Sequence, residues 1–424
     1  MIDQITKWLF FLSIFAACIA GAFGFGLAVG HYQIWPNAEI RNLQNNLISL
    51  IRFQEFVPDG RRMAAPVRAK AERHFILNPK AAQQDGYFAM LGWSDRASRY
   101  QVWLYGADGE LAHSWPIDDL ALSDVAKSRS NAPHALRVLK DGSVIFNFDR
   151  LGELHRLDAC GDAIWSISKA YHHSLAPSQD GTLWTWAGRE EVGDDYQYMV
   201  RIDPETGQER ERIGLIEQVF EQSAAQATAL SLQSGFPIAT NSDDALDRFH
   251  PNDVEELLPE MAGAFPQFAA GDLLVSLRNL NMVAVIGRSG EIKWAAYGPW
   301  HQQHDPDFNP DGTISIFDNN RGRGPSRIIS IVPDETVSLP QPHAAPEFAS
   351  DFRGKHQRLP NGALLIVIPE EGRVIEVAQD GEVLREINNL SERAGFHEDV
   401  ANAYWLPADH FDQMPLCQEK RAVE

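Results

Sequence analysis

His304-Asp-Pro-Asp-Phe-Asn-Pro-Asp311-Gly312 is one of three stretches in which a histidine lies seven residues before the aspartate of an Asp-Gly pair. The other two are His134-Ala-Leu-Arg-Val-Leu-Lys-Asp141-Gly142 and His173-Ser-Leu-Ala-Pro-Ser-Gln-Asp180-Gly181, and a looser copy is His356-Gln-Arg-Leu-Pro-Asn361-Gly362. A fifth stretch, His250-Pro-Asn-Asp-Val, is followed at a distance by Gly271-Asp272-Leu-Leu-Val. Such turn pairs are typical of tight connections between β-strands. A repeat that sets an imidazole at one position of each unit can gather those imidazoles in space.

Each turn is followed by a short β-rich run, which we interpret as a strand. The runs are Ser143–Phe148, Thr182–Trp186, Leu273–Leu277, Thr313–Phe317 and Ala363–Ile368. Each run is followed by a second strand, at Glu153–Leu157, Met199–Ile202, Met282–Ile286, Arg327–Ile331 and Arg373–Val377. Further turns lead to closing strands such as Gly290–Trp294 and Gly381–Arg385. Four strands in a unit of about 40 residues, repeated along the chain, are the signature of a β-propeller.

We count six units, which begin near residues 84, 133, 172, 250, 303 and 355. The stretch from about 215 to 248 breaks the rhythm and predicts a helical or irregular insertion. A pair of β-sandwiches would not explain why turns and histidines recur in phase. The first strand of a propeller blade lies nearest the central axis, so we expect the repeated histidines around one end of the central channel. They are His134, His173, His250, His304 and His356, with His172 as the alternative to its neighbour.

The composition indicates a globular protein with a substantial core, because 44% of the residues are hydrophobic and 10% are aromatic. The formal net charge of −21 argues against nucleic acid as a partner, since like charges repel. The three cysteines, Cys18, Cys160 and Cys417, show no metal-ligand spacing. Cys160 and Cys417 could form a disulfide, although nothing in their spacing requires one.

The segment from Trp8 to Gly30 contains 23 residues without a charged side chain. A helix of that length spans the hydrocarbon core of a bilayer. A cleaved signal peptide is the rival interpretation, but the apolar run continues past the small residues that a cleavage site would need. We therefore predict a single-pass anchor in the inner membrane through residues 8–30. The chain then divides into an anchor (1–36), a short helical or irregular stalk (37–80) and an all-β six-bladed propeller (81–424).

The charges beside this segment give an ambiguous orientation. Lys7 precedes it, whereas Arg41, Arg52, Arg61 and Arg62 follow it. By the positive-inside rule this pattern places the body of the protein in the cytoplasm, but large downstream domains translocate largely regardless of such charges. Charge alone therefore leaves the side of the membrane open.

Several stretches resemble the arylsulfate sulfotransferase family, which are bacterial membrane-linked or periplasmic six-bladed propellers. The resemblance covers roughly residues 130–410. Its most specific segment is Gln303-His304-Asp-Pro-Asp-Phe followed by Ile316-Phe-Asp-Asn-Asn-Arg-Gly-Arg323. The other matching stretches are His250-Pro-Asn-Asp-Val, Leu273-Leu-Val-Ser-Leu-Arg-Asn279, Gly290-Glu-Ile-Lys-Trp294, Gln357-Arg-Leu-Pro-Asn-Gly362 and Gly372-Arg-Val-Ile-Glu-Val377. The resemblance implies a membrane-anchored protein whose propeller lies in the periplasm.

Members of this family transfer a sulfuryl group from a phenolic sulfate ester to a phenol through a sulfated histidine. The resemblance implies those two small molecules as partners, and neither a cofactor nor a metal. It implies His250, His304 and one arginine, Arg321 or Arg323, as the binding and activating set. It implies a histidine of the next blade as the nucleophile, and His356 is the one available. The remaining histidines of the mouth, which would line the channel, are His134, His172 and His173.

These residue types suit sulfuryl transfer. The transition state spreads negative charge over peripheral oxygens, as in phosphoryl transfer, and a guanidinium offers those oxygens a planar fork. A neutral imidazole can attack sulfur, while a second imidazole protonates the departing phenoxide and later deprotonates the acceptor. Histidine performs both tasks near neutral pH.

Three alternatives remain open on the sequence. A membrane-tethered propeller that only binds partners would place His250, His304, His356, Arg321 and Arg323 apart from one another. A quinoprotein-like dehydrogenase would share closing strands of this type but would need more blades than the six units found. A histidine cluster could also bind zinc or copper, but no paired cysteines or supporting carboxylate spacing accompany it.

Overall fold

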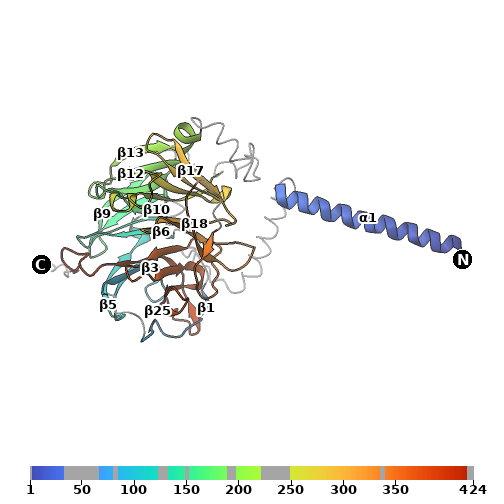
Figure 1. The fold of residues 1–424 in the computed structure, drawn as a ribbon. Coiled ribbons are helices and arrows are strands. Elements are labelled where there is room, and N and C mark those ends of the chain that lie inside the picture. The colour runs from blue at the N-terminus through green and yellow to red at the C-terminus, as the bar shows by residue number, and fades with distance from the viewer. Residues whose placement is uncertain are drawn as a thin grey trace.

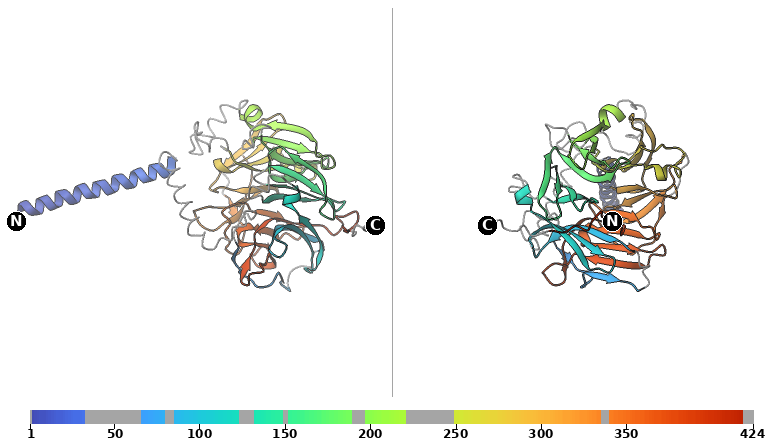
Figure 2. Two further views of the ribbon diagram at one scale, coloured as in Figure 1. Left: turned by 180° about the vertical axis from the view of Figure 1, so that it is seen from behind. Right: turned by 90° about the vertical axis from the view of Figure 1, so that its left-hand side faces the viewer.

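The computed structural model describes residues 2–32, 66–79, 85–122, 132–148, 152–188, 197–220, 249–334 and 340–417. Within these residues, six antiparallel sheets radiate from a common axis, as the right-hand view of Figure 2 shows. Each sheet contains a four-stranded meander whose first strand is innermost. The chain is therefore a six-bladed β-propeller with an N-terminal apolar helix.

We number the blades 1 to 6 and give the strands of each from the axis outward. Blade 1 contains β27 (Val400–Leu406), β3 (Tyr87–Ser94), β4 (Arg99–Gly106) and β5 (Leu111–Ile117), and blade 2 contains β6 (Pro133–Val138), β7 (Val144–Phe148), β8 (Glu153–Leu157) and β9 (Ala163–Ser168). Blade 3 contains β10 (Tyr171–Pro177), β11 (Leu183–Ala187), β12 (Tyr198–Ile202) and β13 (Glu209–Gly214), and blade 4 contains β14 (Pro251–Glu256), β15 (Leu273–Leu277), β16 (Met282–Ile286) and β17 (Ile292–Tyr297). Blade 5 contains β18 (His304–Phe308), β19 (Ile314–Asp318), β20 (Arg327–Ile331) and β21 (Gln341–Pro342), and blade 6 contains β22 (Lys355–Arg358), β23 (Leu364–Ile368), β24 (Arg373–Val377) and β25 (Val383–Asn388). The inner strands contact one another in the closed ring β27–β6–β10–β14–β18–β22.

The ring is closed by a strand from the C-terminal part of the chain. β27 pairs with β3, so blade 1 combines the last long strand with the first three long strands of the propeller. The unit counted from near residue 84 therefore begins with Tyr87–Ser94, which is the second strand of its blade. Opening the ring here would break the whole ladder of hydrogen bonds between β27 and β3.

The strands that follow the tight turns occupy the places predicted for them. β7, β11, β15, β19 and β23 are the second strands of their blades, and every residue in them is buried. Strands covered on both faces need no polar side, which explains their almost continuous apolar runs. The core of the protein thus lies between adjacent blades, in clusters such as the one that joins Trp184 and Trp186 of blade 3 to Val275 of blade 4.

Five of the six inner strands carry a register irregularity near their first residues. It lies between Pro133 and Leu136, His172 and Ala176, Pro251 and Asp253, His304 and Asp307, and Val400 and Asn402. Such a bulge bends the strand and re-aims the side chains beside it. β22, by contrast, pairs regularly from Lys355 to Arg358.

Side-chain amides tie the beginnings of four inner strands, β6, β10, β18 and β22, to a neighbouring blade. Asn147 Nδ2 donates to the carbonyl oxygen of His173 over 3.0 Å, and Asn252 Nδ2 donates to that of Gln303 over 2.8 Å. Asn319 and Asn402 make the same kind of bond. Because these amides are buried, they fix where these four strands start.

Helix α1 (Ile2–Tyr32) contains the apolar stretch Phe10–Val29, whose length and composition make it a candidate for a single membrane span. Figure 1 shows this helix apart from the sheets. The predicted insertion begins with a π-helix at Leu215–Phe220. Its remaining part, residues 221–248, lies outside the described residues.

Part of the segment that we predicted as a stalk pairs with strands of the propeller. β1 (Val67–Arg68) pairs with β26 (Phe396–His397), and β2 (Phe75–Leu77) adds a fifth strand to the outer edge of β25. Residues 66–79 therefore belong to the propeller, where they cover a sheet edge that would otherwise expose unpaired backbone groups. The remaining part of the predicted stalk, residues 33–65, lies outside the described residues.

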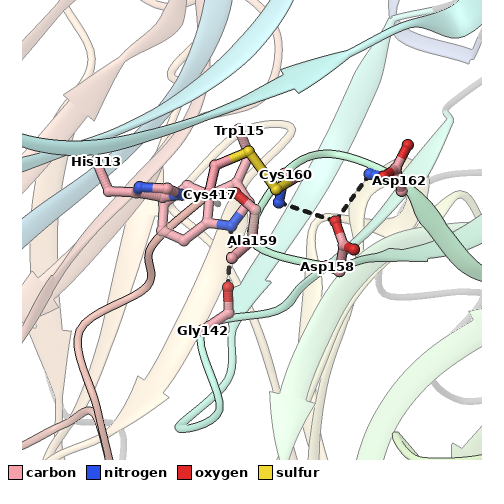
Figure 3. The surroundings of a disulfide bond; sticks show 8 residues. All are labelled: His113, Trp115, Gly142, Asp158, Ala159, Cys160, Asp162 and Cys417. Atoms are coloured by element: carbon pink, nitrogen blue, oxygen red, sulfur yellow. Dashed lines mark hydrogen bonds between the residues drawn. A yellow bond between two sulfur atoms is a disulfide. The ribbon is translucent and has the colours of Figure 1, made fainter. Parts of the chain in front are cut away.

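Cys160 and Cys417 form a disulfide with a Cα–Cα distance of 4.7 Å (Figure 3). Cys160 lies in the turn between β8 and β9, and Cys417 lies in the segment that follows β27. Close by, Trp115 Nε1 donates to the carbonyl oxygen of Gly142 over 2.9 Å. The disulfide thus fastens the segment behind the ring-closing strand to blade 2.

Candidate functional site

Five imidazoles gather at the end of the central channel where the inner strands begin, which we call the channel mouth. They belong to His134 in β6, His172 and His173 in β10, His250 immediately before β14, and His304 at the start of β18. We call these five residues the histidine cluster. The ring of His173 lies centrally, with centroid distances of 4.4 Å to His134, 5.1 Å to His250 and 6.3 Å to His304. Four successive blades therefore supply one cluster.

The backbone is bent where two of these rings enter the cluster. His173 and His250 have φ angles of 58° and 43°, in the left-handed region that few residues other than glycine adopt. Holding a non-glycine residue there costs about 1–3 kcal/mol, and it persists only where the surrounding structure enforces it. The bulges of the inner strands and the amide ties between blades supply that enforcement.

The cluster is buried except at one member. His134, His172, His173 and His304 are at most 5% exposed, whereas His250 is partly exposed. Burial, followed by repulsion from the surrounding imidazoles, lowers the pKa of His173 well below its ordinary value of 6.5. Burial, followed by the charge of Arg278, does the same to the pKa of His304. Both rings are therefore neutral at neutral pH, which is the form that can act as a nucleophile.

Asn319 holds His304 in one tautomer. The amide nitrogen of Asn319 donates to the carbonyl oxygens of Ser350 (2.8 Å) and Arg353 (2.7 Å). Its Oδ1 therefore faces His304, 2.7 Å from Nδ1. Because an amide oxygen can only accept and a neutral imidazole carries one proton, that proton lies on Nδ1. Nε2 of His304 keeps its lone pair.

His356 lies outside the histidine cluster. Its Nδ1 is 3.0 Å from Asp305 Oδ2, and its Nε2 is 2.7 Å from Ser315 Oγ, in a fully buried position between blades 5 and 6. The reason is register, because β22 lacks the bulge of the other inner strands and His356 pairs regularly with Ile366. In blade 6 the place seven residues before the turn pair belongs to Gly354. The structure thus does not bring the expected nucleophile to the other predicted residues.

A network of four carboxyl groups and one ammonium group continues along the inner strands next to the cluster. Lys355 Nζ lies 2.8 Å from Asp253 Oδ1 and 2.6 Å from Asp305 Oδ1. Against the effect of burial, the Lys355 charge lowers the pKa of Asp305 to about 2. Burial raises the pKa of Asp253 to about 6 and that of Glu255 to about 8, and it raises the pKa of Asp307 well above its ordinary value.

Three members of this region have potential metal ligands close together. The ligand atoms of Asp305, Asp307 and His356 lie within 4.8 Å of one another. The oxygens of Asp305, however, already accept hydrogen bonds from Lys355 and from His356. The cation that the structure places beside Asp305 is therefore the ammonium group of Lys355.

The two arginines that the resemblance implies lie at the rim of the mouth. The Arg321 guanidinium stacks over Phe352, 4.2 Å from the ring centroid, and its Nη1 is 3.4 Å from Gln302 Oε1. Arg323 is exposed. The binding-scaffold alternative predicted that five residues would lie apart from one another. The structure brings two of them, His250 and His304, together in the histidine cluster. The other three, His356, Arg321 and Arg323, lie outside the cluster.

Arg278 is a residue that the sequence analysis missed. It lies in a 3-10 helix (Arg278–Leu280) directly after β15, and its charge acts on His304. β15 runs antiparallel to β14, so its last residue returns to the channel mouth. An arginine directly after a predicted second strand was therefore a usable signal for a position in the site.

Comparisons with known proteins agree with this architecture. The model of the family described as arylsulfotransferase (ASST) matches residues 135–389. No curated protein matches the chain. Among solved structures, a Bacteroides caccae protein of unknown function has a TM-score of 0.50 at 10% identity, with 76% of this chain and 99% of that chain covered. This likeness shows the fold alone.

Two further solved structures are more distant. Selenomethionine-substituted virginiamycin B lyase from Staphylococcus aureus has a TM-score of 0.35 at 15% identity, with 60% of this chain and 69% of that chain covered. A functionally unknown protein from Desulfotomaculum acetoxidans DSM 771 has a TM-score of 0.39 at 10% identity, with 74% and 99% covered.

Proposed function

Because the chain belongs to the arylsulfotransferase family, we propose that it transfers a sulfuryl group from a phenolic sulfate ester to a phenol at the histidine cluster. Family membership suggests a transferase. The observation that carries the proposal is the state of His304, a buried neutral imidazole whose proton is held on Nδ1 by Asn319. Its Nε2 is thereby prepared to act as a nucleophile among four further imidazoles.

In the first half-reaction, Nε2 of His304 attacks sulfur. The N–S bond forms while the bond from sulfur to the aryl oxygen breaks, and the phenoxide leaves. The sulfated ring carries a positive charge, and Asn319 Oδ1 stabilises it through the Nδ1 proton. The same hydrogen bond keeps the ring oriented, which lowers the entropic cost of reaching the reactive geometry.

We assign the proton transfers to His250. It is the partly exposed member of the cluster, so it can exchange protons with solvent. Its protonated ring gives the proton to the leaving phenoxide, and it later accepts the proton of the entering phenol. Acid–base assistance of this kind contributes about a hundred- to ten-thousandfold to the rate.

In the second half-reaction, the oxygen of the acceptor phenol attacks sulfur and the N–S bond breaks. The electron pair returns to Nε2 of His304, so the enzyme ends in its starting state. We assign to Arg278 the stabilisation of the charge on the peripheral sulfuryl oxygens, and the effect of its charge on the pKa of His304 supports this assignment.

We further propose that the propeller lies in the periplasm, anchored by α1. The disulfide between Cys160 and Cys417 supports an oxidising compartment, since disulfides rarely persist in the bacterial cytosol. The apolar stretch Phe10–Val29 supports a single membrane span.

The test is to incubate the full chain with p-nitrophenyl sulfate and phenol and to follow nitrophenol release. Mass spectrometry of peptides from protein trapped without acceptor should locate one sulfuryl group on His304. His304→Gln should abolish both turnover and adduct. Absence of turnover and adduct over a broad panel of phenols would favour a propeller that binds partners without catalysis.

A further inference from the structure

Residues 350–353, which we call the entry segment, lead into β22 and form neither helix nor strand. The carbonyl oxygens at its two ends, those of Ser350 and Arg353, accept both N–H groups of the Asn319 amide over 2.8 and 2.7 Å. The same amide presents Oδ1 to Nδ1 of His304. Because the entry segment has no helix or ladder to fix it, its shape depends on the groups that bind its backbone N–H groups.

Glu370 binds the two N–H groups that lie between these carbonyls. It belongs to the 3-10 helix Pro369–Glu371, which directly follows β23. β23 runs antiparallel to β22, so its end returns to the level at which β22 begins. Oε2 of Glu370 accepts the N–H of Asp351 over 2.6 Å, and the carboxyl group also accepts the N–H of Phe352. One side chain of blade 6 thus spans the middle of the entry segment.

The carboxyl group of Glu370 is partly buried, whereas Asp351 and Phe352 are exposed. Burial raises the pKa of Glu370 to about 7, although the bound N–H groups favour its ionised form. Little water therefore competes for its oxygens. A hydrogen bond to an ionised group is stronger than one between neutral groups, so this contact is suited to hold an exposed stretch of backbone in place.

The neighbouring carboxylate of Glu371 is placed differently. It accepts the N–H of Ala349 over 3.1 Å, which lies before the entry segment. It also pairs with Lys70 and Arg373, at 2.7 and 2.6 Å. Of these two consecutive glutamates, Glu370 is the one that binds between the carbonyls that Asn319 uses.

The position of those carbonyls decides which atom of Asn319 faces His304. If they move away, the amide group loses the partners of its nitrogen and can turn over, because its oxygen and nitrogen are similar in size. Nδ2 would then donate to Nδ1 of His304, and the proton of the ring would lie on Nε2. A ring in that tautomer has no lone pair on Nε2 with which to attack sulfur.

We propose that Glu370 is a positioning residue for the reaction of His304, which it serves through the entry segment and the Asn319 amide. The carboxyl group holds the backbone of blade 6, the backbone holds the amide, and the amide selects the tautomer. This inference deepens the proposed function and rests on it for the chemistry of His304. The tautomer, however, can be measured without turnover.

The experiment uses the full chain in detergent micelles, with its histidines labelled with ¹⁵N. Nitrogen NMR shows which ring nitrogen carries the proton, and His304→Gln identifies the signal of His304. Glu370→Ala should convert the single Nδ1-protonated form into a mixture with the Nε2-protonated form. With p-nitrophenyl sulfate and phenol, it should lower kcat by about 10- to 100-fold and leave KM nearly unchanged, as expected for a residue that orients a reactive group.

Two further variants separate positioning from a general loss of stability. Glu370→Gln keeps an accepting oxygen, so it should restore the tautomer and most of kcat. Asp95→Ala is the matched control, because Asp95 Oδ2 accepts the backbone N–H of Glu392 over 3.1 Å in a different loop. We expect it to lower the melting temperature without changing the tautomer of His304 or kcat.

A folded Glu370→Ala protein with the tautomer and kcat of the wild type would overturn the inference. So would a Glu370→Gln protein that restores neither, or an Asp95→Ala protein with the same change of tautomer. If Glu370→Ala does not fold, Glu370→Asp takes its place, because the shorter side chain withdraws the carboxylate from the entry segment. A tautomer that depends on Glu370 in a protein without sulfuryl transfer would refute the proposed function and leave the positioning role standing.

Discussion

Oδ1 of Asn319 lies 2.7 Å from Nδ1 of His304 and accepts its only proton, because the amide nitrogen is committed to two backbone carbonyls. This relationship places the proton of a buried histidine on Nδ1 and leaves the lone pair on Nε2. Asn319 also links His304 to the next blade, since the two carbonyls belong to Ser350 and Arg353, which precede β22.

Replacing Asn319 with aspartate should alter the acid side of the pH–rate profile. In the wild type, burial keeps the pKa of His304 well below 6.5, so the ring stays neutral and kcat/KM should not fall between pH 7 and pH 6.5 through this group. A carboxylate at 319 favours the protonated ring and raises that pKa, which moves the acid limb to higher pH. We expect kcat to fall by about 10- to 100-fold, as for other residues that orient a reactive group.

Asn252→Asp is the matched control, because Asn252 also ties its blade to the next, through a hydrogen bond from Nδ2 to the carbonyl oxygen of Gln303. Thermal denaturation should show losses of stability in both variants, since both lose a buried amide donor. A shift of the acid limb in the control as large as that in Asn319→Asp would mean that the pH effect is not specific to His304.

His356→Gln should retain the sulfuryl adduct that His304→Gln loses. His356 is held by Asp305 and Ser315 away from the cluster, so we expect a structural effect only. Removing its ring breaks the hydrogen bonds to Asp305 Oδ2 and Ser315 Oγ, whereas the backbone N–H of residue 356 still donates to Asp305 Oδ2. The loss should lower the free energy of unfolding by about 1–3 kcal/mol. Peptide mapping after reaction with p-nitrophenyl sulfate makes the comparison, and an adduct on the peptide that contains residue 356 would reverse our assignment.

The blades could be predicted from the sequence because their signals are local. A turn pair, a buried apolar run and a second strand lie within a few residues of one another, as in Asp311-Gly312 followed by Ile314–Asp318. The closing pair β27–β3 has no such signal, since its strands lie at opposite ends of the propeller sequence and no turn connects them. The pairing of β27 with β3 therefore cannot be predicted from a local pattern.

The site was predicted only as far as the repeat is regular. His134, His173 and His304 share one spacing to their turns, and the structure brings them to one cluster. His356 lies only five residues before Asn361, and a change in register along a strand redirects a side chain. The different spacing of His356 therefore indicates a position outside the histidine cluster. The burial of Arg353 depends on packing between blades 6 and 1, which no local pattern records.

Glu255→Gln should flatten the dependence of stability on pH between about 4.5 and 8. Burial raises the pKa of Glu255 from 4.5 to about 8, so in that range the folded protein holds a proton that the unfolded chain releases. The folded state binds more protons, and this group therefore makes stability fall as pH rises through the window. Glutamine does not titrate, so the variant should lose that part of the slope. Melting temperatures at several pH values, with exposed Glu260→Gln as control, measure the difference, and an unchanged slope would refute the buried protonated carboxyl.

The disulfide should contribute to stability by holding the ring closed. Cys160 and Cys417 are 257 residues apart in sequence, and their bond fastens the segment behind β27 to blade 2. We expect Cys160→Ser to lower the free energy of unfolding by about 2–4 kcal/mol, which is typical for a native disulfide. Reductant should destabilise the wild type by a similar amount and leave the variant unaffected, whereas Cys18→Ser, in α1, should keep the full response to reductant. If the wild type melts at the same temperature with and without reductant, β27 alone holds the ring and the covalent tie adds nothing to its closure.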